Sequence, residues 1–307
     1  EKGHTHYSSN AGLIELREEI SEYLSSRYGL DYDPREQMIV TVGGSEAIDI
    51  ALRALVTEGD EVIIPEPCFV AYKGCTMTTG ATPVTVNLRE EDRFRLTPEL
   101  LGEAITDRTK VLILSYPNNP TGAIMTWEDM KKIVDVLKDR DIIVISDEMY
   151  SELTYEGKHV SIASFPEMKD KTVVVNGFSK AFAMTGWRLG YVCGHRVLVE
   201  AMKKIHQYAL MCPPTMAQHA ALEALRNSEE DVRMMAREYN RRRRLVVNSF
   251  RKMGLSCFEP LGAFYVFPCI RPTGLSSDQF CERVLREEKV LIVPGTAFGE
   301  SGEGFFR

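Results

Sequence analysis

The segment from position 172 to position 193 reads TVVVNGFSKAFAMTGWRLGYVC. Its two ends, Thr172 to Asn176 and Leu189 to Cys193, are short apolar runs bounded by turn residues, which predicts two buried strands. The loop between them contains Lys180. Ligands of open α/β sheets collect beyond the carboxyl ends of the strands, so a lysine directly after a strand is a candidate functional residue.

The same pattern extends over the N-terminal two thirds of the chain. Further buried strands are predicted at Val62 to Pro65, Val111 to Ser115 and Ile142 to Ser146. Helices are predicted at 98–105, 127–138 and 197–210, where apolar residues recur at helical spacing. This alternation predicts an α/β fold: a large domain with a mostly parallel sheet flanked by helices.

The pattern changes after Thr215. Residues 218–225 and 229–253 predict helices, 255–259 and 263–267 predict strands, and 277–288 predict a last helix. We therefore expect a large cofactor-binding domain at 1–237 and a smaller α+β domain at 238–307. The chain starts without Met and stops inside an apolar segment at Arg307, so we expect a fragment whose small domain is truncated.

Composition narrows the class of protein. The 307 residues are 44% hydrophobic and 26% charged, with no apolar run near the roughly 18 residues of a membrane span. The net charge of -7 argues against a nucleic-acid partner. Seven dispersed cysteines without a Cys-x-x-Cys pair argue against a disulfide framework or a metal site and favour the cytoplasm.

Other polar segments follow predicted strands. Asn118 to Gly122 follows one strand, Asp147 and Tyr150 follow the next, and Gly43 to Glu46 starts a helix after Thr41. Each of these features has a simpler explanation when taken alone. Asn118 to Gly122 is suited to a turn, Gly43 to Glu46 to a helix start capped by serine, and Lys180 to a solvated loop. Neither a Gly-x-Gly-x-x-Gly sequence nor a Walker phosphate loop is present, which argues against dehydrogenases and NTPases.

Taken together and in this order, these segments resemble the class I/II aminotransferases of fold type I. The most specific part is Ser179 to Tyr191, and the segments at 118–122 and 147–150 fall where the family has them. The resemblance covers nearly the whole chain. It implies pyridoxal 5'-phosphate (PLP) as cofactor and a ping-pong reaction that moves the amino group of an L-amino acid to a 2-oxo acid.

The resemblance also implies catalytic roles. Lys180 carries the cofactor as a Schiff base and then acts as general base and acid. Asp147 pairs with the pyridine nitrogen, and Asn119 and Tyr150 bind the phenolic oxygen, with Asn119 also at the substrate. Phe69 is similar to the aromatic residue that stacks on the ring.

The phosphate group has its own expected ligands. They are Gly44, Ser45, the backbone amide of Glu46, Ser179 and Arg188. The carboxylate of Glu46 would repel the phosphate, so we expect this side chain to turn away. One branch of the family has a serine where this chain has Gly177, so the phosphate contact of that serine is not expected here.

Two further residues concern the partner subunit and the substrate. Tyr7 is similar to a tyrosine that reaches the phosphate of the neighbouring subunit, which implies a homodimer with shared active sites. Arg307 resembles the arginine that clamps the substrate carboxylate.

The function class and the amino-acid donor both stay open at this stage. A carbon–sulfur β-lyase would share the fold and cofactor, and a cofactor-sensing regulatory domain would need a basic DNA-binding module. Aromatic, aspartate, alanine and diaminopimelate-type donors all remain possible. Residues 68–72 and 208–215 are expected to line the side-chain pocket.

Overall fold

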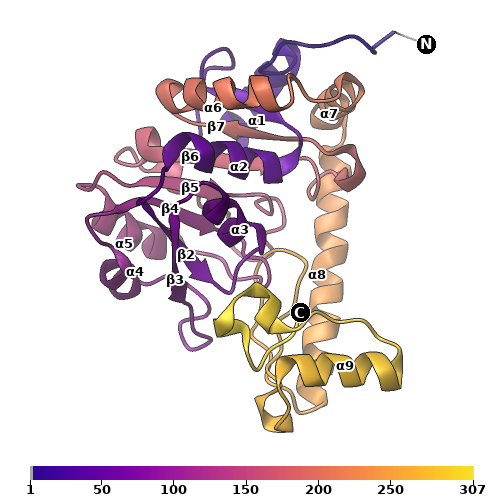
Figure 1. Cartoon of the computed structure of the whole chain (residues 1–307). Coiled ribbons are helices and arrows are strands. Elements are labelled where there is room, and N and C mark those ends of the chain that lie inside the picture. Colours follow the sequence, from indigo (N-terminus) through magenta and orange to yellow (C-terminus); the bar gives the residue numbers. More distant parts are fainter. Residues whose placement is uncertain (1–2) are drawn as a thin grey trace.

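A seven-stranded sheet forms the centre of the computed structural model, which describes residues 3–307 (Figure 1). The strand order is β1-β7-β6-β5-β4-β2-β3. Only β7 runs antiparallel to its neighbours, β1 and β6, so the prediction of a mostly parallel sheet is confirmed. The strands are β1 Met38–Thr41, β2 Glu61–Glu66, β3 Thr82–Asn87, β4 Thr109–Ser115, β5 Ile143–Asp147, β6 Thr172–Gly177 and β7 Gly190–Cys193.

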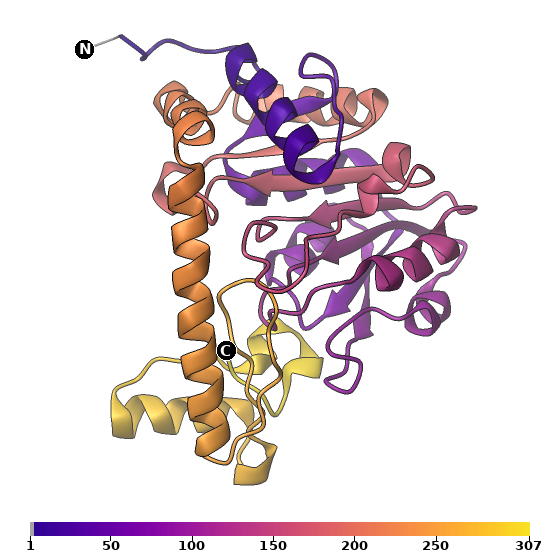
Figure 2. The same ribbon diagram turned by 180° about the vertical axis from the view of Figure 1, so that it is seen from behind.

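Helices cover both faces of the sheet (Figures 1 and 2). Side chains alternate between faces along a strand, so Val111 and Ile113 of β4 join one apolar cluster while Leu112 and Leu114 join another. The first face packs against α2 Gly43–Leu55, α3 Ala71–Thr78 and α6 Arg196–Ala209. The second face packs against α1 Ile14–Tyr28, α4 Pro98–Ala104, α5 Trp127–Leu137 and α7 Thr215–Asn227.

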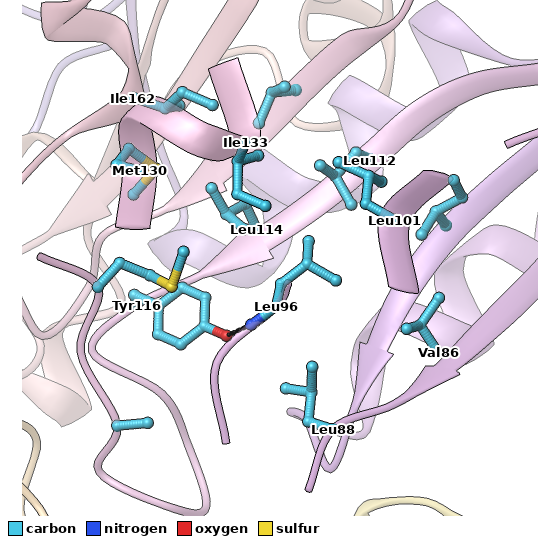
Figure 3. Close-up of a cluster of buried hydrophobic side chains, with 14 of the residues drawn as sticks. Val86, Leu88, Leu96, Leu101, Leu112, Leu114, Tyr116, Met130, Ile133 and Ile162 are labelled. Atoms are coloured by element: carbon cyan, nitrogen blue, oxygen red, sulfur yellow. Dashed lines mark hydrogen bonds between the residues drawn. The ribbon is translucent and has the colours of Figure 1, made fainter. Parts of the chain in front are cut away.

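One buried tyrosine anchors the loop that follows β4. The cluster under α4 and α5 includes Leu112, Leu114 and Ile133, and Tyr116 lies at its edge (Figure 3). The Tyr116 hydroxyl accepts a hydrogen bond from Leu96 N and donates one to Phe94 O, both at 3.0 Å. A buried hydroxyl with both partners is satisfied, so the chain leaves β4 along a fixed path.

A long helix connects the sheet region to the C-terminal part. Helix α8, Glu229–Lys252, runs along one side of the molecule in both views and ends beside α9, Ser277–Glu288 (Figures 1 and 2). The capping box of Ser276 and Gln279 fixes the start of α9 at the predicted residue. Position 237/238 lies inside α8, and the division of the chain into two domains there stays a prediction.

The predicted strands at 255–259 and 263–267 were wrong. The first segment makes one isolated bridge, Cys257 with Pro268, and the second makes none, although Gly262 just before it bridges to Thr154. The reason lies at Gly262, where a Cβ atom would come within 2.5 Å of Pro117. Ala263 then takes a left-handed φ of 54°, so the chain bends around the 117–122 loop rather than extending along a neighbour.

None of the helices within residues 3–307 is long and apolar enough to span a membrane.

Candidate active site

A cavity of about 350 Å³ opens at the carboxyl ends of the parallel strands. It is lined by Gly44, Ser45, Ile48, Phe69, Tyr72, Ser115, Asn119, Asp147, Met149, Tyr150, Ser179, Lys180, Thr185, Arg188, Tyr265 and Arg307. All of the predicted site residues are among them except Glu46 and Tyr7. Loops after β1, β4, β5 and β6 therefore bring the separate sequence segments to one place.

The carboxylate of Asp147 lies at the floor of this cavity. Asp147 ends β5 and pairs in register with Ser115, the last residue of β4. Its Oδ2 accepts a hydrogen bond of 2.6 Å from the Tyr72 hydroxyl, and its Oδ1 accepts one of 3.1 Å from Met149 N. Burial raises the pKa of Asp147, while the bonds from Tyr72 and Met149 act in the opposite direction and favour the ionised form.

Lys180 lies in an aromatic and cationic environment. Its Nζ is 5.6 Å from the ring centre of Phe264 and 5.8 Å from that of Tyr150. Burial lowers the pKa of Lys180, and the positive charges of Arg188 and Arg307 lower it further. The neutral amine is the form that attacks a carbonyl carbon and accepts a proton, so these surroundings favour the reactive form.

Arg307 also lines the cavity and is fixed by both its backbone and its side chain. Its backbone N and O pair with Val293 at 2.8 and 3.0 Å, and its Nη1 donates a 2.9 Å hydrogen bond to Asn119 Oδ1. The guanidinium carbon lies 4.5 Å from the ring centre of Tyr265, whose hydroxyl is 2.7 Å from that of Tyr150. Arg307 is therefore ordered and presents a positive charge to the cavity.

The third wall is the start of α2. Gly43 has a φ of 77°, and a Cβ atom at this position would lie 2.7 Å from Nη2 of Arg188. Gly44 and Ser45 follow in the first turn, where unpaired N–H groups and the helix dipole favour an anion. Arg188, itself at a φ of 54°, thus lies against a helix start that fits a phosphate group.

Glu46 turns away from this anion site, as expected from the sequence. One carboxylate oxygen accepts a hydrogen bond from Val42 N, and the other bonds Nδ1 of His206. His206 is fully buried on α6, and its Nε2 lies 2.8 Å from Asn10 O. Val42 is the N-cap residue of α2, and Glu46 rather than Ser45 bonds its N–H group, which corrects the explanation of this segment as a serine-capped helix.

Replacing Glu46 with alanine is expected to lower the free energy of unfolding by about 1 to 3 kcal/mol, because Val42 N–H and the buried His206 ring would both lose their acceptor. Urea-induced unfolding measures the change. Glu46→Gln keeps one acceptor oxygen and should lose less. Equal stability of wild type and Glu46→Ala would contradict the capping role.

Several predicted residues lie elsewhere. Tyr7 is outside the cavity and 82% exposed, and no residue of 208–215 lines it. The sequence did not single out Ser115, Met149, Thr185 or Tyr265, and Tyr72 was expected at the substrate rather than under Asp147.

Within residues 3–307, no group of three or more His, Cys, Asp and Glu side chains could hold a metal ion.

A second cavity, of about 410 Å³, lies between α1, α7 and α8. Its charged side chains pair with one another, as in Arg27 with Glu152 and Arg226 with Glu19, each at 2.8 Å. Lysine is absent from its wall, and three of its four carboxylates are held in ion pairs with arginines, so the cavity at the sheet edge is the candidate active site.

Comparisons with known proteins agree with this geometry. The family model of class I and II aminotransferases matches residues 1–307. The chain belongs to this family. The Bacillus subtilis protein YugH is 53% identical over 100% of this chain and 80% of its own length. An aspartate aminotransferase of Pyrococcus abyssi is 46% identical over 99% of this chain and 79% of its own.

Solved structures agree as well. The aromatic aminotransferase from Pyrococcus horikoshii OT3 superposes with a TM-score of 0.98 at 46% identity, over 100% of this chain and 83% of that protein. The protein is a PLP-dependent aminotransferase that moves the amino group of an L-amino acid to a 2-oxo acid by a ping-pong mechanism. The residues of the cavity fit the cofactor, because a cationic helix start suits its phosphate and a carboxylate suits its ring nitrogen.

Proposed function

We propose that the aminotransferase carries out its reaction in the cavity at the sheet edge, with Lys180, Asp147 and Tyr150 as catalytic residues. The observation that carries this assignment is the convergence of one lysine, one carboxylate and two arginines in a single cavity. PLP, when bound, supplies an aldehyde that condenses with amines and a ring that withdraws electrons from the substrate Cα.

The catalytic and cofactor-binding tasks are then divided among the polar groups of the cavity. Lys180 takes the proton from the substrate Cα and returns it, since its surroundings favour the neutral amine. Arg188, Gly44, Ser45, Ser179 and the Glu46 amide hold the phosphate, while Phe69 covers the ring. Asn119 accepts from Arg307 through Oδ1, which leaves its Nδ2 to donate, together with the Tyr150 hydroxyl, to the phenolic oxygen of the cofactor.

The proposed donor is an L-amino acid with an aromatic side chain. Arg307 takes the α-carboxylate, and Arg188 is engaged with the phosphate. No third arginine is present in the lining of the described cavity, whereas Tyr265 contributes an aromatic ring beside Arg307. A second carboxylate would therefore stay without a partner from this subunit, while an aromatic side chain can pack against Tyr265.

A donor screen tests this preference. Phenylalanine, tyrosine, aspartate, alanine and diaminopimelate are compared in half-reactions that follow the absorbance change of the bound cofactor. We expect the aromatic donors to react with the highest second-order rate constants. A higher constant for aspartate would overturn the substrate assignment, and no conversion with any donor would overturn the cavity as the active site.

We also propose that two copies form a dimer in which Tyr7 reaches the phosphate of the partner subunit. Tyr7 is exposed, and so are the apolar side chains of Tyr208, Leu210, Met211 and Met216, between the end of α6 and the start of α7. The N-terminal segment is tied to this stretch, because Thr215 Oγ1 donates to His6 O and Asn10 Nδ2 donates to Met211 O. An exposed apolar surface of this kind marks a protein interface.

Mixed dimers test the shared site. Tyr7→Phe alone should weaken cofactor binding about tenfold through loss of one charge-assisted hydrogen bond. Lys180→Ala alone should be inactive. Coexpression of the two variants should restore activity above either parent, because one site of the mixed dimer combines an intact Lys180 with an intact Tyr7. Activity no higher than that of Tyr7→Phe would show that Tyr7 acts within its own subunit or not at all.

The proposed compartment is the cytoplasm. All seven cysteines are free, and five of them are buried: Cys68, Cys193, Cys257, Cys269 and Cys281. Free buried thiols are typical of a reducing environment.

A further inference from the structure

The hydroxyl group of Tyr72 has two polar contacts, and both lie at the floor of the active-site cavity. It is 2.6 Å from Asp147 Oδ2 and 2.9 Å from Ser115 Oγ. Tyr72 itself is 1% exposed. Three elements meet at this point, since Tyr72 lies on α3 while Ser115 and Asp147 are the paired last residues of β4 and β5.

The number of protons fixes the direction of these hydrogen bonds. A tyrosine hydroxyl carries one proton, and an ionised carboxylate can only accept. The proton of Tyr72 therefore goes to Asp147, and the contact with Ser115 is made by the serine hydroxyl donating to the tyrosine oxygen. The result is a chain from Ser115 through Tyr72 to Asp147, in which each bond polarises and strengthens the next.

The ring of Tyr72 contacts a second cofactor-facing residue. Its centre lies 5.7 Å from that of Phe69, with an angle of 80° between the rings. This edge-to-face arrangement is a favourable one for two aromatic rings. Tyr72 thus supports Phe69, the proposed stacking residue, with its ring, and Asp147 with its hydroxyl.

We propose that Tyr72 is a positioning residue that keeps Asp147 ionised and oriented toward the pyridine nitrogen of the cofactor, with Ser115 as its second member. This inference rests on the proposed role of Asp147. A carboxylate in a buried site is stabilised in its charged form by donors, and Tyr72 and Met149 N are the two donors that reach Asp147. The aspartate can then leave the shared proton on the ring nitrogen, where it strengthens electron withdrawal from the substrate.

Loss of the Tyr72 hydroxyl should move that proton. Without this donor the carboxylate has a higher proton affinity, so the proton shifts from the ring nitrogen toward Asp147. In the resting holoenzyme of Tyr72→Phe, prepared with ¹⁵N-labelled PLP, we expect the ring-nitrogen resonance to move toward its unprotonated value at neutral pH. The dissociation constant of the cofactor should rise about tenfold, as one charge-assisted bond is lost. Ser115→Ala should move the resonance in the same direction by a smaller amount.

Tyr116→Phe is the matched control. It also removes a buried tyrosine hydroxyl with two hydrogen bonds, but those bonds lead to Phe94 and Leu96, and the residue does not line the cavity. It should reduce stability and leave the ring-nitrogen resonance unchanged. A Tyr72→Phe spectrum that matches wild type would overturn the proposal, and so would an equal displacement in Tyr116→Phe.

Asp147→Ala distinguishes the role of Asp147 from that of Tyr72. If the resonance moves in Asp147→Ala and stays in Tyr72→Phe, the role of Asp147 holds and that of Tyr72 is wrong. If Asp147→Ala leaves it unchanged, the assignment of Asp147 fails and the inference about Tyr72 fails with it. Should Tyr72→Phe not fold, Ser115→Ala carries the test, and an unmoved resonance there would overturn the hydrogen-bonded chain.

Discussion

Replacing Lys180 with alanine is expected to lower the turnover number by on the order of 10⁴-fold or more, because the variant loses both the covalent anchor of the cofactor and the general base. No other lysine lines the described cavity, so a replacement for either function is absent from its wall. Single-turnover measurements with an excess of amino-acid donor give the rate constant. Small primary amines added to Lys180→Ala should restore part of the rate, since they can accept the proton in the space of the missing side chain.

Lys158→Ala is the control for this experiment. Lys158 is an exposed lysine outside the cavity, and its loss should leave turnover unchanged. Borohydride treatment of the wild-type holoenzyme should add the mass of the cofactor to the peptide that contains Lys180. Labelling of another lysine would refute the assignment of Lys180.

The large sheet could be predicted because its strands are signalled locally. Strands buried on both faces are continuous apolar runs, and the five predicted ones correspond to the parallel strands β2, β4, β5 and β6 and to the antiparallel strand β7. The edge strand β3 at Thr82–Asn87 was missed, since it is largely exposed, contains Pro83 and carries no continuous apolar run. The site residues in the loops after these strands could be predicted as well, because the carboxyl ends of parallel strands lie at the same edge of the sheet.

Contacts that depend on packing could not be predicted. Tyr72 reaches Asp147 only because α3 packs against the face that contains Val62 and Ile64, and nothing in the local sequence fixes that distance. Tyr265 enters the cavity because Gly262 lets its loop approach Pro117. That contact joins positions far apart in the sequence, so the alternating apolar pattern of 263–267 was interpreted as a strand.

Replacing Arg307 with alanine is expected to lower kcat/KM for amino-acid donors by about 10³-fold, since the substrate carboxylate would lose a charge-assisted, bidentate partner. Arg307→Lys keeps the charge without the planar fork and should recover only part of the loss. Primary amines that lack a carboxylate should lose far less than amino-acid donors in Arg307→Ala. A similar loss for such amines would show that the substitution damages the cavity rather than carboxylate binding.

Arg271→Ala is a matched control for Arg307→Ala, because the guanidinium of Arg271 also lies over an aromatic ring, 4.9 Å from the centre of Phe305, yet outside the cavity. It should leave kcat/KM unchanged.

The pH profile gives an independent test of the position of Arg307. Its positive charge contributes to lowering the pKa of Lys180, behind burial and Arg188, so its removal allows that pKa to rise. A higher pKa leaves less neutral amine at a given pH, and capture of the cofactor by the cofactor-free protein should therefore require a higher pH in Arg307→Ala. A profile that moves to lower pH, or one that moves equally in Arg271→Ala, would contradict the position of Arg307 close to Lys180.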